Sequence, residues 1–221
     1  MGANSATDGT LRLEQADLLR RGIDEMGLVV TDEQQQKMLD YLGLLEKWNK
    51  AYNLTAVRDT LQMVTRHLLD SLTVVPYIKG ARILDVGTGA GLPGIPLAIL
   101  FPNVQFVLLD SSSKKTRFIT QAVTALAIDN VTVHNGRVEA YRADSLFDQI
   151  VSRAFAEISL MVSLSAHLLS PDGEWLAMKG HYPVAELAAL EATCERFEVT
   201  KVVVPGMDAA RHIVQLKPKS V

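Results

Sequence analysis

The ten residues from Asp85 to Gly94 (DVGTGAGLPG) have the residue types of a loop that binds a nucleotide. The segment follows a short β-branched run at 81–86 and precedes an apolar stretch, which predicts a strand, a turn and a helix. Glycines there let the backbone turn tightly and approach a ligand without a Cβ in the way. Asp110 lies 19 residues after Gly91, at the end of the next predicted strand, where a carboxylate can accept hydrogen bonds from ribose hydroxyls.

The spacing of the glycines separates two classes of cofactor. The dinucleotide fingerprint is G-x-G-x-x-G, and from Gly87 its last glycine falls at Leu92. This chain instead has G-x-G-x-G, with glycines at Gly87, Gly89 and Gly91 and an acidic residue, Asp85, two positions earlier. That pattern is typical of methyltransferases that use S-adenosylmethionine (SAM). Two alternatives stay open: an NAD site, and a turn that only packs a strand on a helix.

The elements that must position this loop alternate between strand and helix after residue 80. Such alternation predicts an α/β protein of Rossmann-like type, with a mainly parallel seven-stranded sheet. The last two strands alternate in hydrophobicity like an antiparallel pair. The predicted strands are 81–86, 104–109, 131–134, 149–151, 174–178, 199–205 and 212–217, and the predicted helices are 93–101, 114–126, 159–169 and 184–197.

The first 80 residues are predicted to be helical. A helical pattern covers 11–26, after a small polar segment at 1–10 that we expect to be frayed. Thr31 with Gln34 three residues later resembles a capping box that begins a second helix. A third helix is predicted over 60–75. We therefore expect an N-terminal helical region at 1–80 and a Rossmann-like domain at 81–221.

Composition limits the classes of protein that remain. The chain has 221 residues and a formal net charge of −3, and its acidic excess lies in 1–60, since 61–221 holds 15 basic and 15 acidic residues. Its single cysteine, Cys194, excludes an internal disulfide or a multi-cysteine metal site, and no metal is expected. No run resembles a membrane span or a secretory signal. We expect a cytoplasmic monomer in a reducing compartment.

Several further segments, in this order and spacing, resemble the bacterial small-subunit rRNA methyltransferase G family, also called glucose-inhibited division protein B. The resemblance covers roughly residues 35–217. The combination of RHLLDS, GTGAGLPGIP and SRAF is the most specific part. The segments are NKAYNLT at 49–55, RHLLDS at 66–71, DVGTGAGLPGIPLAI at 85–99, LLDSSSKKTRF at 108–118, RVE at 137–139, SRAF at 152–155, MKG at 178–180 and RHIV at 211–214.

This resemblance implies SAM-dependent methylation of N7 of a guanine (position 527 in bacterial reference numbering) in 16S rRNA of the 30S ribosomal subunit or its precursor. It implies that the cofactor contacts Gly87, Leu92, the Val138–Glu139 pair and Arg153. Position 90 is often proline in the family and is Ala90 here. The change alters the stiffness of the turn and is not expected to abolish binding.

The chemistry of the remaining residues agrees with such a reaction. Guanine N7 carries a free lone pair, so the enzyme must align two reactants and exclude water, with no proton to remove. Methylation at cytosine C5 needs a nucleophilic cysteine, and Cys194 falls in a predicted helix away from the strand ends. Methylation of an exocyclic amine commonly uses an Asn/Asp-Pro-Pro-aromatic motif, where this chain reads SRAF.

Individual side chains have a functional and a structural interpretation. Arg153 follows a strand, where open α/β sheets bind ligands, and it competes with a structural ion pair. His67 and Asp70 share a helix face, so His67 either positions substrate or forms a buried hydrogen bond to Asp70. Lys179 is a third positioning candidate, or a solvated lysine. The residues predicted to contact RNA are Lys114, Lys115, Arg117 and Arg211.

Three other functions stay open from the sequence. They are a SAM-dependent enzyme acting on a small molecule, a noncatalytic nucleotide-binding module, and an NAD-dependent oxidoreductase.

Overall fold

A seven-stranded sheet forms the centre of the computed structural model, which describes residues 3–155, 157–190 and 194–219. The strand order is β3-β2-β1-β4-β5-β7-β6, with β7 antiparallel to both of its neighbours and the other pairs parallel. The predicted mainly parallel sheet with a terminal antiparallel pair is confirmed. The strands are β1 (Arg82–Val86), β2 (Gln105–Asp110), β3 (Val131–Asn135), β4 (Phe147–Arg153), β5 (Leu169–Lys179), β6 (Cys194–Val202) and β7 (Arg211–Pro218).

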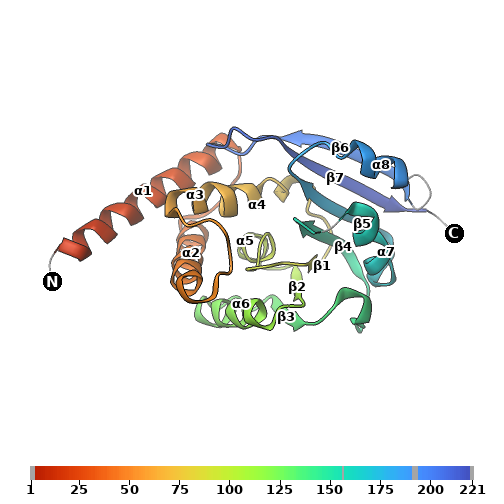
Figure 1. Ribbon diagram of the computed structural model, residues 1–221, viewed down its shortest axis with the longest axis horizontal. Coiled ribbons are helices and arrows are strands. Elements are labelled where there is room, and N and C mark those ends of the chain that lie inside the picture. The colour runs from red at the N-terminus through yellow and green to blue at the C-terminus, as the bar shows by residue number, and fades with distance from the viewer. Residues whose placement is uncertain (1–2, 156, 191–193, 220–221) are drawn as a thin grey trace.

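Helices cover both faces of this sheet, and Figure 1 shows α2, α3 and α6 gathered on one side of the strands and α7 and α8 on the other. The α-helices are α1 (Ala3–Glu25), α2 (Asp32–Tyr52), α3 (Thr60–Met63), α4 (Asp70–Leu72), α5 (Gly94–Leu100), α6 (Ser113–Ala125), α7 (Ile158–Ser165) and α8 (Val184–Leu190). A π-helix, η1 (Val64–Leu69), joins α3 to α4, and short 3₁₀ turns lie at η2 (Val75–Tyr77), η3 (Val138–Ala140) and η4 (Ala166–Leu168).

The strand side chains divide between two cores because successive residues of a strand point to opposite faces. Ile83 and Phe106 pack with Leu42 and Leu68 from the first 80 residues in one core. Leu84 and its neighbours on the other face pack in a second core, with α7 and α8. The helical region at 1–80 therefore shares a hydrophobic core with the Rossmann-like part.

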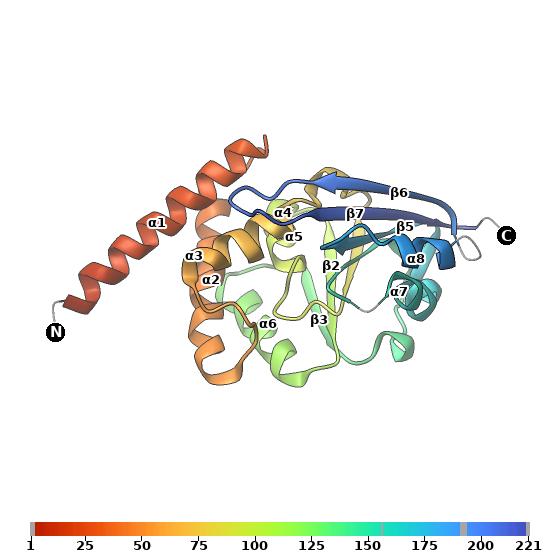
Figure 2. The same ribbon diagram turned by 45° about the horizontal axis from the view of Figure 1, so that its top comes forward.

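The N-terminal helices begin and end at residues with clear physical roles. The Thr31 hydroxyl accepts from the Gln34 amide at 3.2 Å and the Gln34 side chain accepts from the Thr31 amide at 3.0 Å, which confirms the predicted capping box. Helix α1 already begins at Ala3, so the expectation that residues 1–10 are frayed was wrong from Ala3 onward. Figures 1 and 2 show that the first turns of α1 project beyond the rest of the chain.

Two predicted helices differ in the structure. The helix predicted over 60–75 is interrupted by η1, an arrangement that is rare in proteins and frequent at functional sites. The helix predicted over 184–197 ends at Leu190 within the described residues, and Cys194 begins strand β6 instead of lying in a helix. The residues of this stretch favour a helix by composition, but pairing with β7, where Cys194 lies opposite Pro218, makes the stretch from Cys194 a strand. None of the described helices is long and apolar enough to cross a membrane.

Candidate functional site

The glycine loop leaves the carboxyl end of β1 and turns sharply over β2. The backbone amides of Gly87 and Thr88 donate to the Leu109 carbonyl at 2.9 and 3.1 Å. Gly87 has a φ of +66°, and a Cβ added to it would lie 2.7 Å from Cδ2 of Phe155. Glycine is therefore required at position 87 for the backbone angle and for the close approach of another group.

Asp85 holds the loop from beneath. Its side chain is completely buried, and Oδ2 accepts from the Thr88 hydroxyl at 2.7 Å and from the Gly94 amide at 2.8 Å. Burial raises the pKa of this carboxyl to about 6, and the hydrogen bonds from Thr88 and Gly94 oppose the increase. Asp85, predicted as a cofactor contact, thus fixes the shape of the loop through the interior of the protein.

Asp110 supports the same loop from the end of β2. Its Oδ2 accepts from the Gly89 amide at 2.9 Å and its Oδ1 accepts from the Ser112 amide at 2.8 Å. Lys115 lies 3.6 Å from Oδ2. An ionised carboxylate has about four acceptor positions, so Asp110 keeps the capacity to accept further hydrogen bonds from a ligand.

Tyr41 of α2 holds the loop from the helical side. Its hydroxyl donates to the Ala90 carbonyl at 2.7 Å, and burial raises the pKa of this phenol, so it stays a donor. Position 90 therefore contributes a carbonyl to a buried hydrogen bond, which alanine supplies as well as proline does.

A cavity of about 240 Å³, here called the glycine-loop cavity, opens beside the loop. It is lined in part by Gly87, Asp110, Val138, Glu139 and Phe155, so the structure brings together four of the residues predicted to bind the cofactor. Leu92, which was predicted to contact the cofactor, is buried in the core, and a Cβ on Gly91 would lie 2.6 Å from Ile95. These two residues therefore pack the loop against the interior.

A second cavity, of about 600 Å³, lies at the same edge of the sheet and is here called the arginine cavity. Because β7 is antiparallel to β5, the start of β7 lies at the same edge as the end of β4. Phe155 lines both this cavity and the glycine-loop cavity. The charged or ionisable residues predicted as site residues that line it are His67, Arg153, Lys179 and Arg211.

Asp70 organises the arginine cavity. Its Oδ2 accepts from Arg153 Nη1 at 3.0 Å and its Oδ1 accepts from Arg211 Nε at 2.7 Å. The other contacts of these guanidiniums are main-chain carbonyls, since Arg153 donates to the carbonyl of Arg66 and Arg211 donates to that of Ala210, both at 3.0 Å. The structural ion pair considered for Arg153 therefore exists, and its partner is Asp70.

His67 lies in the same cavity, and within the described part of the chain its side chain makes no hydrogen bond to the Asp70 carboxylate. Its Nε2 lies 3.0 Å from the Thr55 hydroxyl, so of the two interpretations left open for His67, the side-chain hydrogen bond to Asp70 does not form. The two oxygens of the Asp70 carboxylate accept from Arg153 and Arg211, and the buried Nδ1 of His67 has no hydrogen-bond partner among the described residues. Burial, followed by the positive charge of Arg153, lowers the pKa of His67 to about 4, so the imidazole is neutral near pH 7.

Lys179, at the end of β5, is an ion-pair partner and not a free lysine. Its Nζ lies 2.9 Å from Oε1 of Glu186. The other oxygen of Glu186 accepts from the Ile158 amide at 2.6 Å, which joins α8 to the start of α7.

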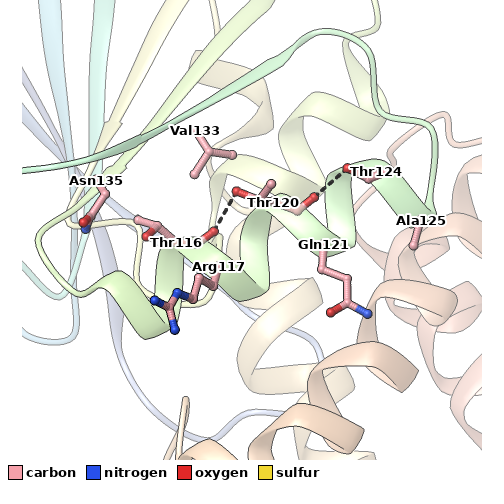
Figure 3. A pocket seen from close by; sticks show the side chains of 8 residues that line it. All are labelled: Thr116, Arg117, Thr120, Gln121, Thr124, Ala125, Val133 and Asn135. Carbon is pink, nitrogen blue, oxygen red and sulfur yellow. Dashed lines mark hydrogen bonds between the residues drawn. The ribbon is translucent and has the colours of Figure 1, made fainter.

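The three basic residues at the start of α6 lie apart from the arginine cavity. Lys114 donates to the Tyr52 carbonyl at 2.9 Å, and Lys115 pairs with Asp110. Arg117 lines a third cavity, of about 490 Å³, between α6 and β3. Figure 3 shows this outer cavity, in which the Thr120 and Thr124 hydroxyls bond to carbonyls of their own helix. It shares no lining residue with the other two cavities.

Sequence reasoning missed Asp70 as a centre of the site, and it missed Phe155 and Tyr41 as parts of it. Asp70 contacts residues 83 and 141 positions away, so no local spacing signals the cluster. The SRAF segment does contain Phe155, and an aromatic residue directly after a strand end was a usable signal.

Comparisons with known proteins agree with the geometry. The family described as rRNA small subunit methyltransferase G (GidB) matches residues 34–214. A protein from Nitrosococcus oceani, named ribosomal RNA small subunit methyltransferase G, is 48% identical over 203 residues, covering 92% of this chain and 95% of its own length. The protein of the same name from Neisseria meningitidis serogroup C is 50% identical over 208 residues, covering 94% and 100%.

Solved structures show the same fold at low identity. The chain is similar to a putative O-methyltransferase from Klebsiella pneumoniae, with a TM-score of 0.57 at 14% identity, over 88% of this chain and 93% of that one. The likeness shows a Rossmann-like methyltransferase fold.

Proposed function

Because the chain belongs to the rRNA small subunit methyltransferase G family, we propose that it transfers a methyl group from SAM to N7 of a guanine in 16S rRNA. The observation that carries the proposal is the position of Phe155. This one side chain lines the glycine-loop cavity and the arginine cavity, so a ligand in each would meet at the glycine loop.

The residues present fit the cofactor. The glycine loop leaves open space beside Gly89, where an added Cβ would meet only the Gly87 carbonyl oxygen, at 4.0 Å. Asp110 and Glu139 place carboxylates in the glycine-loop cavity beside the apolar Val138, a combination suited to ribose hydroxyls and an adenine ring. Arg153 lines the arginine cavity, which shares Phe155 with the glycine-loop cavity, and its positive charge is suited to the carboxylate of the cofactor. When bound, SAM would supply an electrophilic methyl group on a positively charged sulfur.

The chain's own residues have to position the guanine and exclude water. N7 is a hydrogen-bond acceptor of the guanine edge with an available lone pair, so no side chain must remove a proton before the reaction. His67 agrees with this, because it is buried, neutral near pH 7 and engaged with Thr55. The contribution of the site is orientation, which can supply a large share of a rate enhancement.

RNA binding in this proposal uses two groups of basic residues, one in the arginine cavity and one outside it. Arg211 lines the arginine cavity, and Lys114, Lys115 and Arg117 lie at the start of α6. A target nucleotide must leave its stack to reach the cofactor, and basic groups at the cavity edge would hold its backbone. We expect the protein to act as a cytoplasmic monomer on the 30S subunit or its precursor.

Methyl transfer from labelled SAM tests the function. The acceptors are 16S rRNA and small subunits from a strain that lacks this protein, with subunits from a strain that has it as the control. We expect label in the RNA of the first set and little in the control, whose site is already methylated. Tight SAM binding with no label in either RNA would contradict the proposal and favour a small-molecule acceptor.

A further inference from the structure

Asp70 is a buried carboxylate that joins two cations of the arginine cavity. Its side chain is 6% exposed, while those of Arg153 and Arg211 are 18% and 26% exposed. A single carboxylate shared by two guanidiniums leaves one positive charge uncompensated at this point. Each guanidinium has five N–H donors in a fixed fork, and the contacts with Asp70 and the main chain use only some of them. The remaining donors are available to a ligand.

The cavity around this cluster carries an excess of positive charge. Its lining contains Arg66 and Lys179 in addition to Arg153 and Arg211, against the carboxylates of Asp70 and Glu186. The whole chain has a net charge of −3, so this cationic surface is a local feature. An anion is the ligand that partly buried guanidiniums bind most strongly, and phosphate matches the geometry of their N–H groups.

The position of the cluster identifies which anion it meets. The arginine cavity shares Phe155 with the glycine-loop cavity, and Asp110 and Glu139 line only the glycine-loop cavity. A nucleotide held there brings its own phosphate into the cavity. A contact to the guanine base is less suitable for these arginines, because an arginine that reads guanine binds O6 together with N7, and N7 must stay free to react.

We propose that Asp70 is a positioning residue that fixes Arg211 for contact with a phosphate of the RNA strand next to the target guanine. This inference rests on the function proposed above. The negative charge of Asp70 offsets part of the electrostatic repulsion between Arg153 and Arg211. Asp70 also accepts a hydrogen bond from Nε of Arg211, which leaves the outer part of this guanidinium to face the cavity. Without the carboxylate, two like charges would share the cavity, and the long Arg211 side chain would regain its freedom to turn into solvent.

The salt dependence of RNA binding tests the phosphate contact. Each neutralised phosphate contributes about 0.7–0.9 to the slope of log affinity against log salt concentration. We expect Arg211→Gln to lower this slope by about 1 for 16S rRNA, to raise the KM for RNA about tenfold, and to leave the Kd for SAM within about twofold. Arg211→Lys keeps the charge and should restore most of the slope. The matched control is Arg20→Gln on α1, which removes one exposed positive charge outside the cavity and should leave the slope unchanged.

The Asp70 part is tested with Asp70→Asn and Asp70→Glu. Both keep Arg211, and we expect both to move the KM for RNA and the salt slope in the direction of Arg211→Gln. If Asp70 has only a structural role, both variants should have a lower melting temperature, while the salt slope of RNA binding, measured on folded protein, stays unchanged. That result would overturn the positioning role. If Asp70→Asn fails to fold, Asp70→Glu decides, because it retains the buried charge and displaces it by one methylene.

Three outcomes overturn the inference, and they differ from failure of the proposed function. An unchanged slope in Arg211→Gln excludes the phosphate contact. An unchanged slope with methylation of adenine or loss of guanine preference shows a base contact instead. A loss of SAM binding in Arg211→Gln assigns Arg211 to the cofactor. If the proposed function is wrong, the wild-type protein transfers no methyl group to RNA. The salt slope can still be measured in that case, because it comes from equilibrium binding of 16S rRNA and not from activity.

Discussion

Asp70 Oδ2 accepts a hydrogen bond from Arg153 Nη1 at 3.0 Å, and this contact joins the helical region to the end of strand β4. The same carboxylate accepts from Arg211 at 2.7 Å, so one buried side chain connects three parts of the chain. The site at the carboxyl edge of the sheet is therefore built partly by residues before 80, although its glycine loop belongs wholly to the Rossmann-like part.

Removal of Asp70 should destabilise the protein far more than removal of an exposed ion-pair carboxylate. Asp70→Ala leaves two partly buried guanidiniums without their carboxylate, and we expect a loss of about 3 kcal/mol in the free energy of unfolding. The matched control is Asp40→Ala. The Asp40 carboxylate pairs with Arg12 on the surface, and its removal should cost less than about 1 kcal/mol of the free energy of unfolding. Urea denaturation measures both, and equal losses would show that the Asp70 cluster contributes no more than a surface pair.

Replacement of Gly87 should weaken cofactor binding without unfolding the protein. A Cβ at this position meets Phe155 at 2.7 Å and narrows the cavity, so we expect Gly87→Ala to weaken SAM binding about tenfold or more, about 1.4 kcal/mol. Gly27→Ala is the control, because Gly27 has nearly the same φ, +65°, with nothing within 4 Å of the added Cβ. That variant should lose about 1 kcal/mol of stability and keep its SAM affinity. Calorimetric titration with SAM separates the two, and an unchanged affinity in Gly87→Ala would contradict the placement of the cofactor.

His67 should make the protein less stable as the pH falls from about 6.5 toward 4. Its pKa is about 4 in the folded protein and near 6.5 in the unfolded chain, so the unfolded chain binds the proton first. The resulting stability is fully present above pH 6.5 and declines by about 1.4 kcal/mol per pH unit below it. Denaturation of His67→Gln at pH 7.5 and pH 5 should show a smaller decline than the wild type, and an equal decline would exclude His67 as the source.

Titration of Asp85 should make the protein less stable as the pH rises from about 4 to about 6, which is the opposite of the effect of His67. Its pKa rises from 3.8 to about 6 on folding, so the folded state binds more protons between those values and stability decreases as the pH rises through them. Asp85→Asn removes this titration. Its stability relative to the wild type should improve between pH 4 and pH 7 by on the order of 1–3 kcal/mol. The same denaturation series measures the difference, and a constant difference across the range would show that Asp85 does not titrate there.

The glycine loop and the sheet were predictable from the sequence because their signals are local. The strand at 81–86 and the glycines that follow it reappear as β1 and a turn with positive φ at Gly87, Gly89 and Gly91. Alternating hydrophobic positions also predicted the antiparallel β6 and β7.

The parts that were missed depend on contacts between distant residues. Asp70 finds its arginines on β4 and β7, and Tyr41 finds its acceptor 49 residues away at Ala90. The residues around Cys194 have helix-forming neighbours, and only pairing with β7 makes them a strand. The π-helical turn at Val64–Leu69 has no sequence signal of its own, since every residue in it is compatible with an α-helix.

Mapping the methylated base tests the central claim most directly. Small-subunit RNA that lacks the modification is incubated with the wild-type protein and SAM, and the chain is then cleaved by a reaction specific for 7-methylguanosine. We predict one new cleavage at a single guanine of 16S rRNA, absent without SAM and greatly reduced with Gly87→Ala. Methyl transfer to the RNA with no such cleavage, or cleavage spread over many guanines, would contradict the account.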